Sequence, residues 1–456
     1  MSISLAIQGT AFHATTPTTL SILHNYLFLI DNQGKLNAVL APSDGAYAST
    51  LATHKHQPYF LRLKPSQCLL PGFVDTHIHA PQWPQAGKAL HVDLPTWLST
   101  FTFPLEASFQ DTEFAATVYD DLIKTLLANG TTTGLYFGSV HNKPNQILAQ
   151  AAARNGQRAF IGKVVMDEHT QCPDFYCDKD TASALVATEE FLQFTNELNK
   201  ATPQTISGVV TPRFIPTCTD EVLYGLSKLA KQYQVPIQSH VSESDWQHTY
   251  VLRRTGKRDT KAHLDFGLLS DRTVLAHGVF LNDEDAELLK ATGASIAHSP
   301  VSNVLFANAV APIRHLLEKG VSIGLATDIS GGYSPSMFDT MRQAILSSRS
   351  LEDGINPMLS PELRGVPNSR IDFKQAFYMA TAGGAQALKL NSGHFTVGSD
   401  FDAFIFDNDA PHSNLRRYDF DTDEDWLQKI IFMGQRQNIV RLWVQGRMLI
   451  DTTTNA

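Results

Sequence analysis

Short apolar runs alternate with longer stretches of helical periodicity from about residue 67 to residue 392 of the chain. The runs are rich in valine, isoleucine and glycine, and Asp111 and Thr219 stand where two of the intervening helices are expected to begin. The eight runs are "CLLPGFVDTHIH", "GTTTGLYFG", "RAFIGKVVMD", "TISGVVTPRF", "VPIQSHVSE", "TVLAHGVF", "ASIAHSP" and "VSIGLATDIS". Because no G-x-G-x-x-G turn follows the first run, the pattern predicts an α/β fold of the closed (β/α)8 TIM-barrel type.

Both ends of the chain have a different pattern, in which apolar and polar residues alternate as they do in antiparallel strands. The tripeptides "NQG" at 32–34 and "VQG" at 444–446 are expected to form turns between such strands. We therefore predict one small β-sandwich domain formed from both termini, residues 1–66 and 393–456. The barrel domain is predicted to span residues 67–392.

Composition and charge restrict the kind of partner. The chain has 456 residues, 43% of them hydrophobic, which is enough to bury a large core. Its formal net charge of −9 argues against a nucleic-acid partner, because proteins that bind nucleic acids usually present a basic surface. A small-molecule substrate is the expected partner.

The cysteines and the N-terminal segment favour a cytoplasmic protein. The four cysteines form neither a C-x-x-C pair nor a dense disulfide framework, as is usual in a reducing compartment: Cys68, Cys172, Cys177 and Cys218. The first residues, "MSISLAIQGTAFHATT", do not resemble a signal peptide, and no apolar run is long enough to span a bilayer. We therefore expect no membrane partner.

Five polar residues follow the apolar runs at the ends where an active site is expected in a barrel. His77 and His79 end the first run, His240 the fifth, His277 the sixth, and Asp328 the eighth. A single histidine at a strand end is more often a hydrogen-bonded structural residue than a ligand. Five such residues at one end of a barrel predict a metal site. Imidazole and carboxylate groups suit Zn²⁺, and they can also hold Fe²⁺.

Glu243 lies three residues after His240 in "SHVSES" and is the candidate proton carrier. Its structural alternative is a carboxylate at the N-terminus of the helix expected to follow. We favour the catalytic role because no other proton-transfer group lies near this metal ligand in the sequence.

Several motifs identify the chain by resemblance. "PGFVDTHIHAPQ", "SHVSES", "LAHG", "SIAHSPVSN" and "GLATDISGGYS" resemble motifs of the amidohydrolase superfamily. The segments "APQ", "TFP" and "TPRF" resemble the guanine deaminases within it, and the similarity extends over nearly the whole chain. The resemblance implies a hydrolase that converts guanine to xanthine and ammonia in purine catabolism, and it suggests a homodimer.

The resemblance also implies roles for individual residues. It implies one Zn²⁺ per chain held by His77, His79, His240 and Asp328, and one metal only, because the fourth strand ends in "TPRF" rather than in a lysine. His277 would help hold the attacking water, Asp328 would take its proton, and Glu243 would protonate the ring nitrogen beside C2. The expected substrate contacts are Gln82, Arg213, Phe214, His240 and Glu243.

Arginine suits guanine because its planar fork of donors matches the O6 and N7 acceptors of the base. Gln82 offers a donor and an acceptor to another edge of the ring, and Phe214 can stack on it. Two alternatives remain open. One is a related deaminase acting on 8-oxoguanine, a pterin or a triazine, and the other is a barrel scaffold without catalysis.

Overall fold

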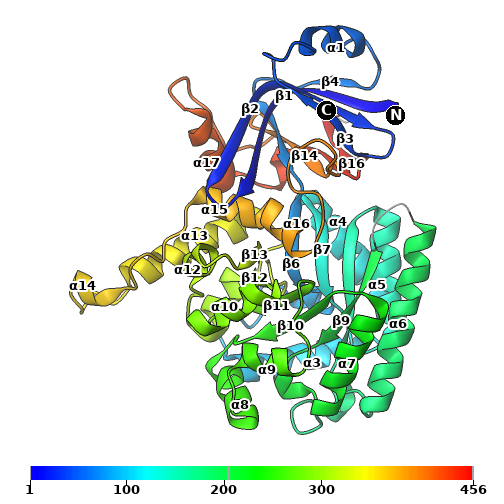
Figure 1. Cartoon of the computed structure of the whole chain (residues 1–456), viewed down its shortest axis with the longest axis vertical. Coiled ribbons are helices and arrows are strands. Elements are labelled where there is room, and N and C mark those ends of the chain that lie inside the picture. The colour runs from blue at the N-terminus through cyan, green and yellow to red at the C-terminus, as the bar shows by residue number, and fades with distance from the viewer. Residues whose placement is uncertain (1, 203–205, 454–456) are drawn as a thin grey trace.

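The computed structural model describes residues 2–202 and 206–453. Eight parallel strands lie side by side in chain order, each paired with the next, and they confirm the predicted (β/α)8 barrel (Figure 1). The strands are β6 (Phe73–His79), β7 (Thr131–Phe137), β8 (Arg158–Val165), β9 (Ile206–Pro212), β10 (Ile237–Val241), β11 (Thr273–His277), β12 (Ser295–His298) and β13 (Ser322–Leu325). Backbone hydrogen bonds from Asp328 N to His77 O (3.0 Å) and from His79 N to Ile329 O (2.7 Å) join the two ends of this sheet.

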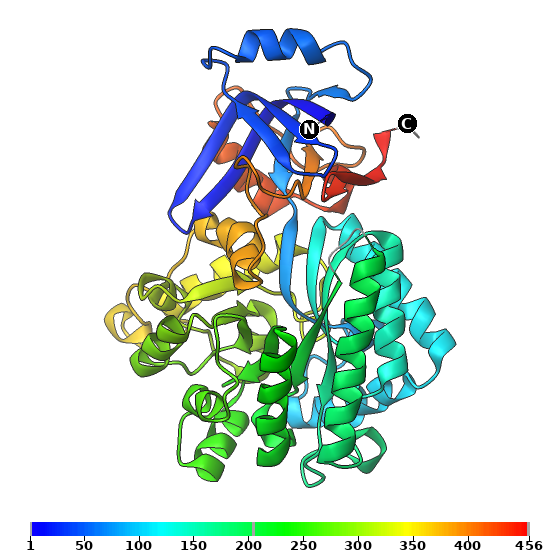
Figure 2. The same cartoon turned by 45° about the vertical axis from the view of Figure 1, so that its right-hand side comes forward.

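Helices cover the outside of the barrel (Figure 2). They include α4 (Thr112–Ala128), α5 (Asn142–Asn155), α6 (Thr181–Ala201), α7 (Asp220–Tyr233), α8 (Asp245–Thr255), α9 (Asp259–Asp265), α10 (Asp283–Thr292), α12 (Ile313–Glu318), α13 (Met337–Asp353), α15 (Phe373–Tyr378) and α16 (Gly384–Ala387). The side chain of Asp111 accepts from the backbone N–H groups of Glu113 and Phe114, and that of Thr219 accepts from Val222 N, so both predicted caps are confirmed. Within the described residues, no helix is long and apolar enough to cross a bilayer.

Both termini contribute to a second sheet. Its strands are β1 (Ile3–Thr16), β2 (Thr19–Asp31), β3 (Leu36–Leu40), β4 (Phe60–Arg62), β5 (Gln67–Pro71), β14 (Ala403–Asp407), β15 (Ile439–Val444) and β16 (Arg447–Asp451). They form one hydrogen-bonded sheet in the order β16-β15-β14-β5-β1-β2-β3, with β4 beside β1. Phe28 and Trp443, from opposite halves, belong to one buried apolar cluster, which is how the sheet encloses a core of its own. Two helices accompany it, α1 (Tyr47–His54) and α17 (Asp423–Met433).

The first predicted strand divides at Gly72 into β5 and β6. A side chain at Gly72 would place its Cβ 2.3 Å from Thr132 Oγ1, so only glycine allows the backbone to pass this close. Since β5 pairs with β1 and β14, we propose Gly72, rather than residue 66, as the boundary between the two domains.

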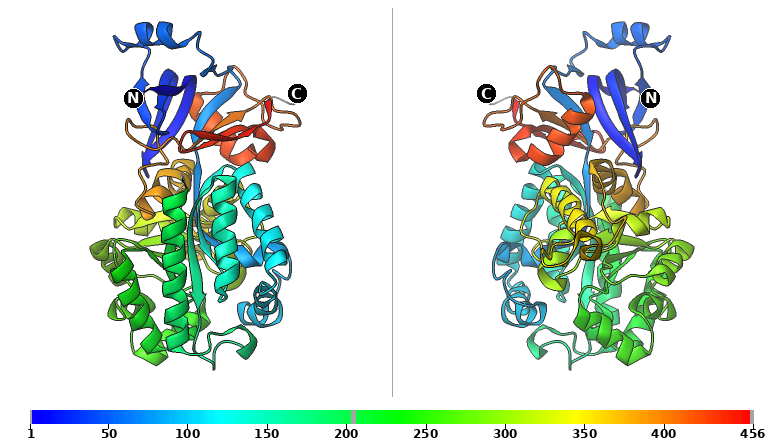
Figure 3. Two further views of the ribbon diagram at one scale, coloured as in Figure 1. Left: turned by 90° about the vertical axis from the view of Figure 1, so that its right-hand side faces the viewer. Right: turned by 90° about the vertical axis from the view of Figure 1, so that its left-hand side faces the viewer.

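The terminal sheet lies against the N-terminal ends of the barrel strands (Figure 3). Arg158, at the start of β8, contacts Asp402 Oδ2 at 2.9 Å and Asp400 Oδ2 at 3.1 Å, and the rings of Phe73 and Phe404 lie 5.0 Å apart. The opposite ends of the strands therefore remain available for a site.

The cysteines differ from the expectation of reduced thiols. Cys172 and Cys177, five residues apart in the loop after β8, form a disulfide, whereas Cys68 and Cys218 are buried free thiols. The sequence did not predict this disulfide, because a single pair of cysteines with C-x4-C spacing is not a recognised disulfide pattern.

Candidate active site

Four histidines converge where the barrel strands end. His77 and His79 lie on alternate positions of β6, and their ring centroids are 4.8 Å apart. The ring of His77 also lies 4.8 Å from that of His240, at the end of β10, and 5.5 Å from that of His277, which ends β11. All four side chains are buried. The structure thus brings together the four histidines predicted from the strand ends.

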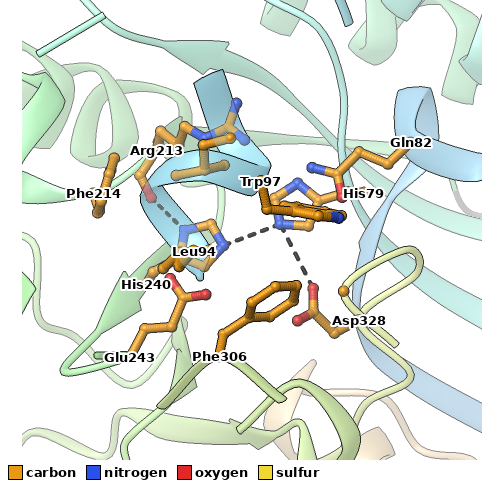
Figure 4. A pocket seen from close by; sticks show the side chains of 12 residues that line it. His79, Gln82, Leu94, Trp97, Arg213, Phe214, His240, Glu243, Phe306 and Asp328 are labelled. Atoms are coloured by element: carbon orange, nitrogen blue, oxygen red, sulfur yellow. Dashed lines mark hydrogen bonds and ion pairs between the residues drawn. The ribbon is translucent and has the colours of Figure 1, made fainter. Parts of the chain in front are cut away.

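Asp328 completes this cluster from the loop after β13. Its Oδ1 lies 3.1 Å from His77 Nε2. The same oxygen lies 3.7 Å from His79 Nε2 (Figure 4). Asp328 and His277 have φ values of 50° and 75°, in the left-handed region that non-glycine residues seldom adopt. Backbone strain of this kind is typical of functional sites.

A buried acid that the sequence did not single out ties these two parts of the site together. Asp75 accepts from His77 N at 3.3 Å and from Thr327 N at 3.0 Å, and it also accepts from the Thr327 hydroxyl. Burial raises the pKa of Asp75 to about 7, although these hydrogen bonds oppose the shift. Asp75 therefore fixes His77 relative to the residue preceding Asp328.

The hydrogen bonds of two histidines leave lone pairs directed into the site. His240 Nδ1 lies 2.5 Å from the Arg213 carbonyl oxygen, and His277 Nδ1 lies 3.0 Å from Asn303 Oδ1. Because both oxygens accept, each Nδ1 carries the proton, and each neutral ring keeps a lone pair on Nε2. Among the described residues, no N–H or O–H group donates a hydrogen bond to His77 Nε2 or to His277 Nε2.

The protonation state of the cluster also suits a cation. Burial lowers the pKa of all four histidines, and for His77, His79 and His240 neighbouring positive groups lower it further. The rings are therefore neutral at physiological pH, which is the state that binds metals. Ligand atoms of His77, His240 and His277, and likewise of His77, His79 and Asp328, lie within 4.8 Å of one another. These donors fit a divalent metal ion.

Glu243 faces the same pocket from the loop after β10. Its Oε1 lies 3.7 Å from His277 Nε2, and its backbone N–H donates to Gln247 Oε1 at 3.2 Å. The cap of helix α8 is Ser244, whose hydroxyl accepts from Gln247 N, so Glu243 does not serve as the helix cap. Burial and the charge of Asp328 raise the pKa of Glu243 to about 8, and Arg213 opposes the shift. Glu243 therefore carries a proton at neutral pH.

Gln82 and Arg213 meet on a buried acid that the sequence analysis missed. Arg213 donates from one terminal nitrogen to Glu106 Oε2 at 2.7 Å and from the other to Glu106 Oε1 at 3.1 Å. Gln82 Nε2 donates to Glu106 Oε1 at 2.7 Å. Glu106 belongs to α3 (Phe103–Ser108), in an irregular segment where no periodic pattern marks an inward-facing acid.

One pocket joins part of the histidine cluster to Gln82 and Arg213 (Figure 4). Its polar lining includes His79, Gln82, Arg213, His240, Glu243 and Asp328, and its apolar lining consists of Leu94, Trp97, Leu98, Phe214 and Phe306. The cavity therefore suits a small molecule with an apolar body and polar edges.

Residues 68–449 match the Amidohydrolase family. The chain belongs to this family, and it is a hydrolase that acts on C–N bonds of cyclic amidines. Membership implies a divalent metal, which the histidine cluster is suited to hold.

Within the family, the chain is similar to guanine deaminases. It is 38% identical to the probable guanine deaminase of Schizosaccharomyces pombe over 85% of this chain and 72% of that protein. It is 35% identical to the guanine deaminase of Rattus norvegicus over 99% and 98% of the two chains. A guanine deaminase structure from C. acetobutylicum with bound guanine superposes with a TM-score of 0.85 at 29% identity, covering 97% of this chain and 99% of that one.

Proposed function

We propose that this chain is a zinc-dependent guanine deaminase that hydrolyses guanine to xanthine and ammonia. One observation carries the proposal: a single pocket is lined by residues of the metal-ligand cluster, by Glu243, and by Arg213 and Gln82. The similarity to guanine deaminases supports guanine as the substrate.

His77, His79, His240 and Asp328 would hold one zinc ion. When bound, the ion supplies a Lewis acid that lowers the pKa of water toward about 7. The second carboxylate oxygen of Asp328 would accept the proton of the attacking water, and His277 Nε2 would hold that water in place. The Asn303 contact keeps the proton of His277 on Nδ1, so its Nε2 remains an acceptor.

Glu243 would act as the general acid and then as the proton carrier. Its carboxyl is protonated at neutral pH and can give its proton to the ring nitrogen beside C2 as water adds to that carbon. Asp328 would hold the proton taken from water and pass it to the amine, so that the C2–N bond breaks and ammonia leaves. The added hydroxyl would give its remaining proton to the Glu243 carboxylate as the C2 carbonyl forms, which restores the acid. Enzymes often place a carboxyl of raised pKa near a second carboxylate, so that the first donates a proton while the second accepts one.

Arg213, Gln82 and Phe214 would recognise the base. Arg213 can donate to the guanine O6 or N7, and Gln82 can pair with a second edge. Phe214 packs 5.7 Å from the ring of Trp246 and borders the cavity, where it can cover one face of the purine. The predicted homodimer, the cytoplasmic location and the place in purine catabolism stay predictions.

Ammonia release by metal-analysed protein tests the proposal. The substrates are guanine, adenine, cytosine, 8-oxoguanine, a pterin and a chlorinated triazine. We expect about one zinc per chain and turnover of guanine at least tenfold faster than of the other compounds. Preference for another compound would favour a related deaminase, and metal-loaded protein inactive on all of them would favour the scaffold alternative.

A further inference from the structure

We infer that Glu106 is a positioning residue that determines how Arg213 and Gln82 meet the carbonyl edge of the substrate. The inference rests on the proposed function, because it assigns recognition of guanine to those two side chains. Glu106 is fully buried, and it does not belong to the lining of the cavity. It would therefore act through its neighbours rather than by touching the base.

The carboxylate of Glu106 joins segments that are distant in the sequence. Arg213 follows β9, and Gln82 lies in the 3-10 helix η1 (Ala80–Gln85) that follows β6. Gln82 Oε1 in turn accepts from Ser330 N at 3.3 Å, in the loop that contains Asp328. One chain of hydrogen bonds thus runs around the pocket from the fourth strand to the eighth.

The contacts with Glu106 use only some of the N–H donors of Arg213. A guanidinium group has five N–H donors, and Glu106 occupies one on each terminal nitrogen of Arg213. The aromatic ring of Phe103, on the same helix as Glu106, lies 5.0 Å from the Arg213 guanidinium carbon and limits its movement further. Because Glu106, which lies outside the cavity lining, holds the Arg213 guanidinium in place, the directions of its remaining N–H groups are fixed.

Glu106 also determines which end of the Gln82 amide faces each neighbour. The carboxylate only accepts, so it requires the amide nitrogen, and the Ser330 N–H requires the amide oxygen. A site preorganised in this way discriminates strongly against ligands that lack the matching polar group. We therefore assign to Glu106 the preference for purines with a carbonyl at C6.

The variant Glu106→Gln tests this assignment, because it keeps the size of the side chain but replaces one acceptor oxygen by a donor. Two inhibitors without the reactive amine report on recognition: hypoxanthine, which has the carbonyl at C6, and purine, which lacks it. We expect the ratio of their inhibition constants, purine over hypoxanthine, to fall about 10- to 100-fold, as for a lost hydrogen bond to a charged group. KM for guanine should rise more than kcat falls.

Thr102→Val is the matched control. Thr102, the residue before α3, is buried and accepts a hydrogen bond from Gln85 Nε2 at 2.9 Å, so it ties the start of α3 to η1 through a bond that involves neither Arg213 nor Gln82. It should leave the inhibitor ratio within about twofold, because its lost bond is neutral and lies away from the recognition pair. A similar fall in both variants would show a structural role only, and an unchanged ratio in Glu106→Gln would overturn the inference.

Two further measurements keep the outcomes separate. Glu106→Asp retains the charge, but its side chain is too short to keep all three contacts. The ratio of inhibition constants should therefore fall by less in Glu106→Asp than in Glu106→Gln. This variant replaces Glu106→Gln in the test if the latter does not fold. If the native enzyme releases no ammonia from guanine, the proposed function fails. Calorimetric binding of hypoxanthine and purine then still tests Glu106, and equal preference in native and variant proteins would refute its role.

Discussion

Buried histidines occur both at the end of the barrel and in the terminal sheet, but their surroundings differ. In the sheet, His13 has a hydrogen-bond donor of its own: its Nδ1 accepts from Phe395 N at 2.9 Å, and its ring stacks on that of Phe395. Burial lowers its pKa to about 4, and the nearby His394 adds to the shift. At the barrel end, His77, His240 and His277 also have lowered pKa values, but their ligand atoms lie within 4.8 Å of one another.

The difference shows what distinguishes a functional histidine. Burial and a lowered pKa are common to both regions, so neither property identifies a ligand. The barrel end instead gathers nitrogen lone pairs from different strands without giving each a hydrogen-bond donor, as His77 Nε2 and His277 Nε2 show among the described residues. Burying a nitrogen lone pair without a hydrogen bond costs free energy, and such an arrangement is retained where a bound cation compensates for that cost.

Two buried arginines repeat the contrast. Arg158 and Arg213 each contact two carboxylate oxygens. Arg158 joins the barrel to Asp400 and Asp402 of the terminal segment, at the end remote from the cavity, whereas Arg213 borders the cavity itself. The same ion-pair chemistry thus fastens two domains at one end of the barrel and presents donors to a ligand at the other.

The largest effect is expected from replacing one histidine in each region by asparagine. His240→Asn removes a proposed ligand, and we expect bound metal to fall below about one tenth per chain and kcat to fall by about 10³ or more, since metal assistance contributes several kcal/mol. Elemental analysis and ammonia release measure the two quantities. His13→Asn should change neither by more than about twofold. Full metal content in His240→Asn would remove this residue from the ligand set.

Glu243 gives the next largest effect. Because its pKa is raised to about 8, the protonated form needed for donation is present at neutral pH and is lost as the pH rises through that value. We expect kcat/KM to fall about tenfold per pH unit above about pH 8. Glu243→Gln should lower kcat by about 10²–10⁴ and abolish this alkaline limb while retaining metal.

Asp245→Asn, two residues further on and exposed, is the control for Glu243. It should retain both the rate and the alkaline limb. An alkaline limb that persists in Glu243→Gln would assign the titration to another group.

Much of the fold could be predicted from local patterns. Alternation on strand β6 places His77 and His79 on one face, and the "VQG" turn forms with φ values of 48° and 71° at Gln445 and Gly446. The break at Gly72 could not be predicted, because apolar residues continue across it and the cause is the close approach of Thr132. Helix α1 was also missed, in a region whose flanking strands dominate the pattern.

The residues of the site likewise fall into those that the sequence could predict and those that it could not. Residues at strand ends could be predicted because the barrel itself determines where they point. Glu106 could not, since its role depends on a contact with Arg213, 107 positions away, and its own helix is short and irregularly connected. Local periodicity therefore finds the residues that bear the chemistry more readily than those that hold them in position.

The smallest effect concerns the stability of the terminal sheet in acid. The folded-state pKa of His13 is lowered from 6.5 to about 4, so the unfolded chain binds a proton first, and this stabilising contribution is complete above pH 6.5 and lost as the pH falls toward 4. Asparagine can replace Nδ1 as the acceptor for Phe395 N but does not titrate. Urea unfolding gives the unfolding free energy of the native protein and of His13→Asn at each pH. Between pH 7.5 and 4.5, the native protein should lose about 2–3 kcal/mol of unfolding free energy relative to the variant. The variant's smaller side chain lowers stability by a constant amount at both pH values, so the change in the difference isolates the titration. A difference that is the same at both pH values would mean that His13 is protonated in the folded sheet, and the contrast with the metal-site histidines would then lie in charge as well as in geometry.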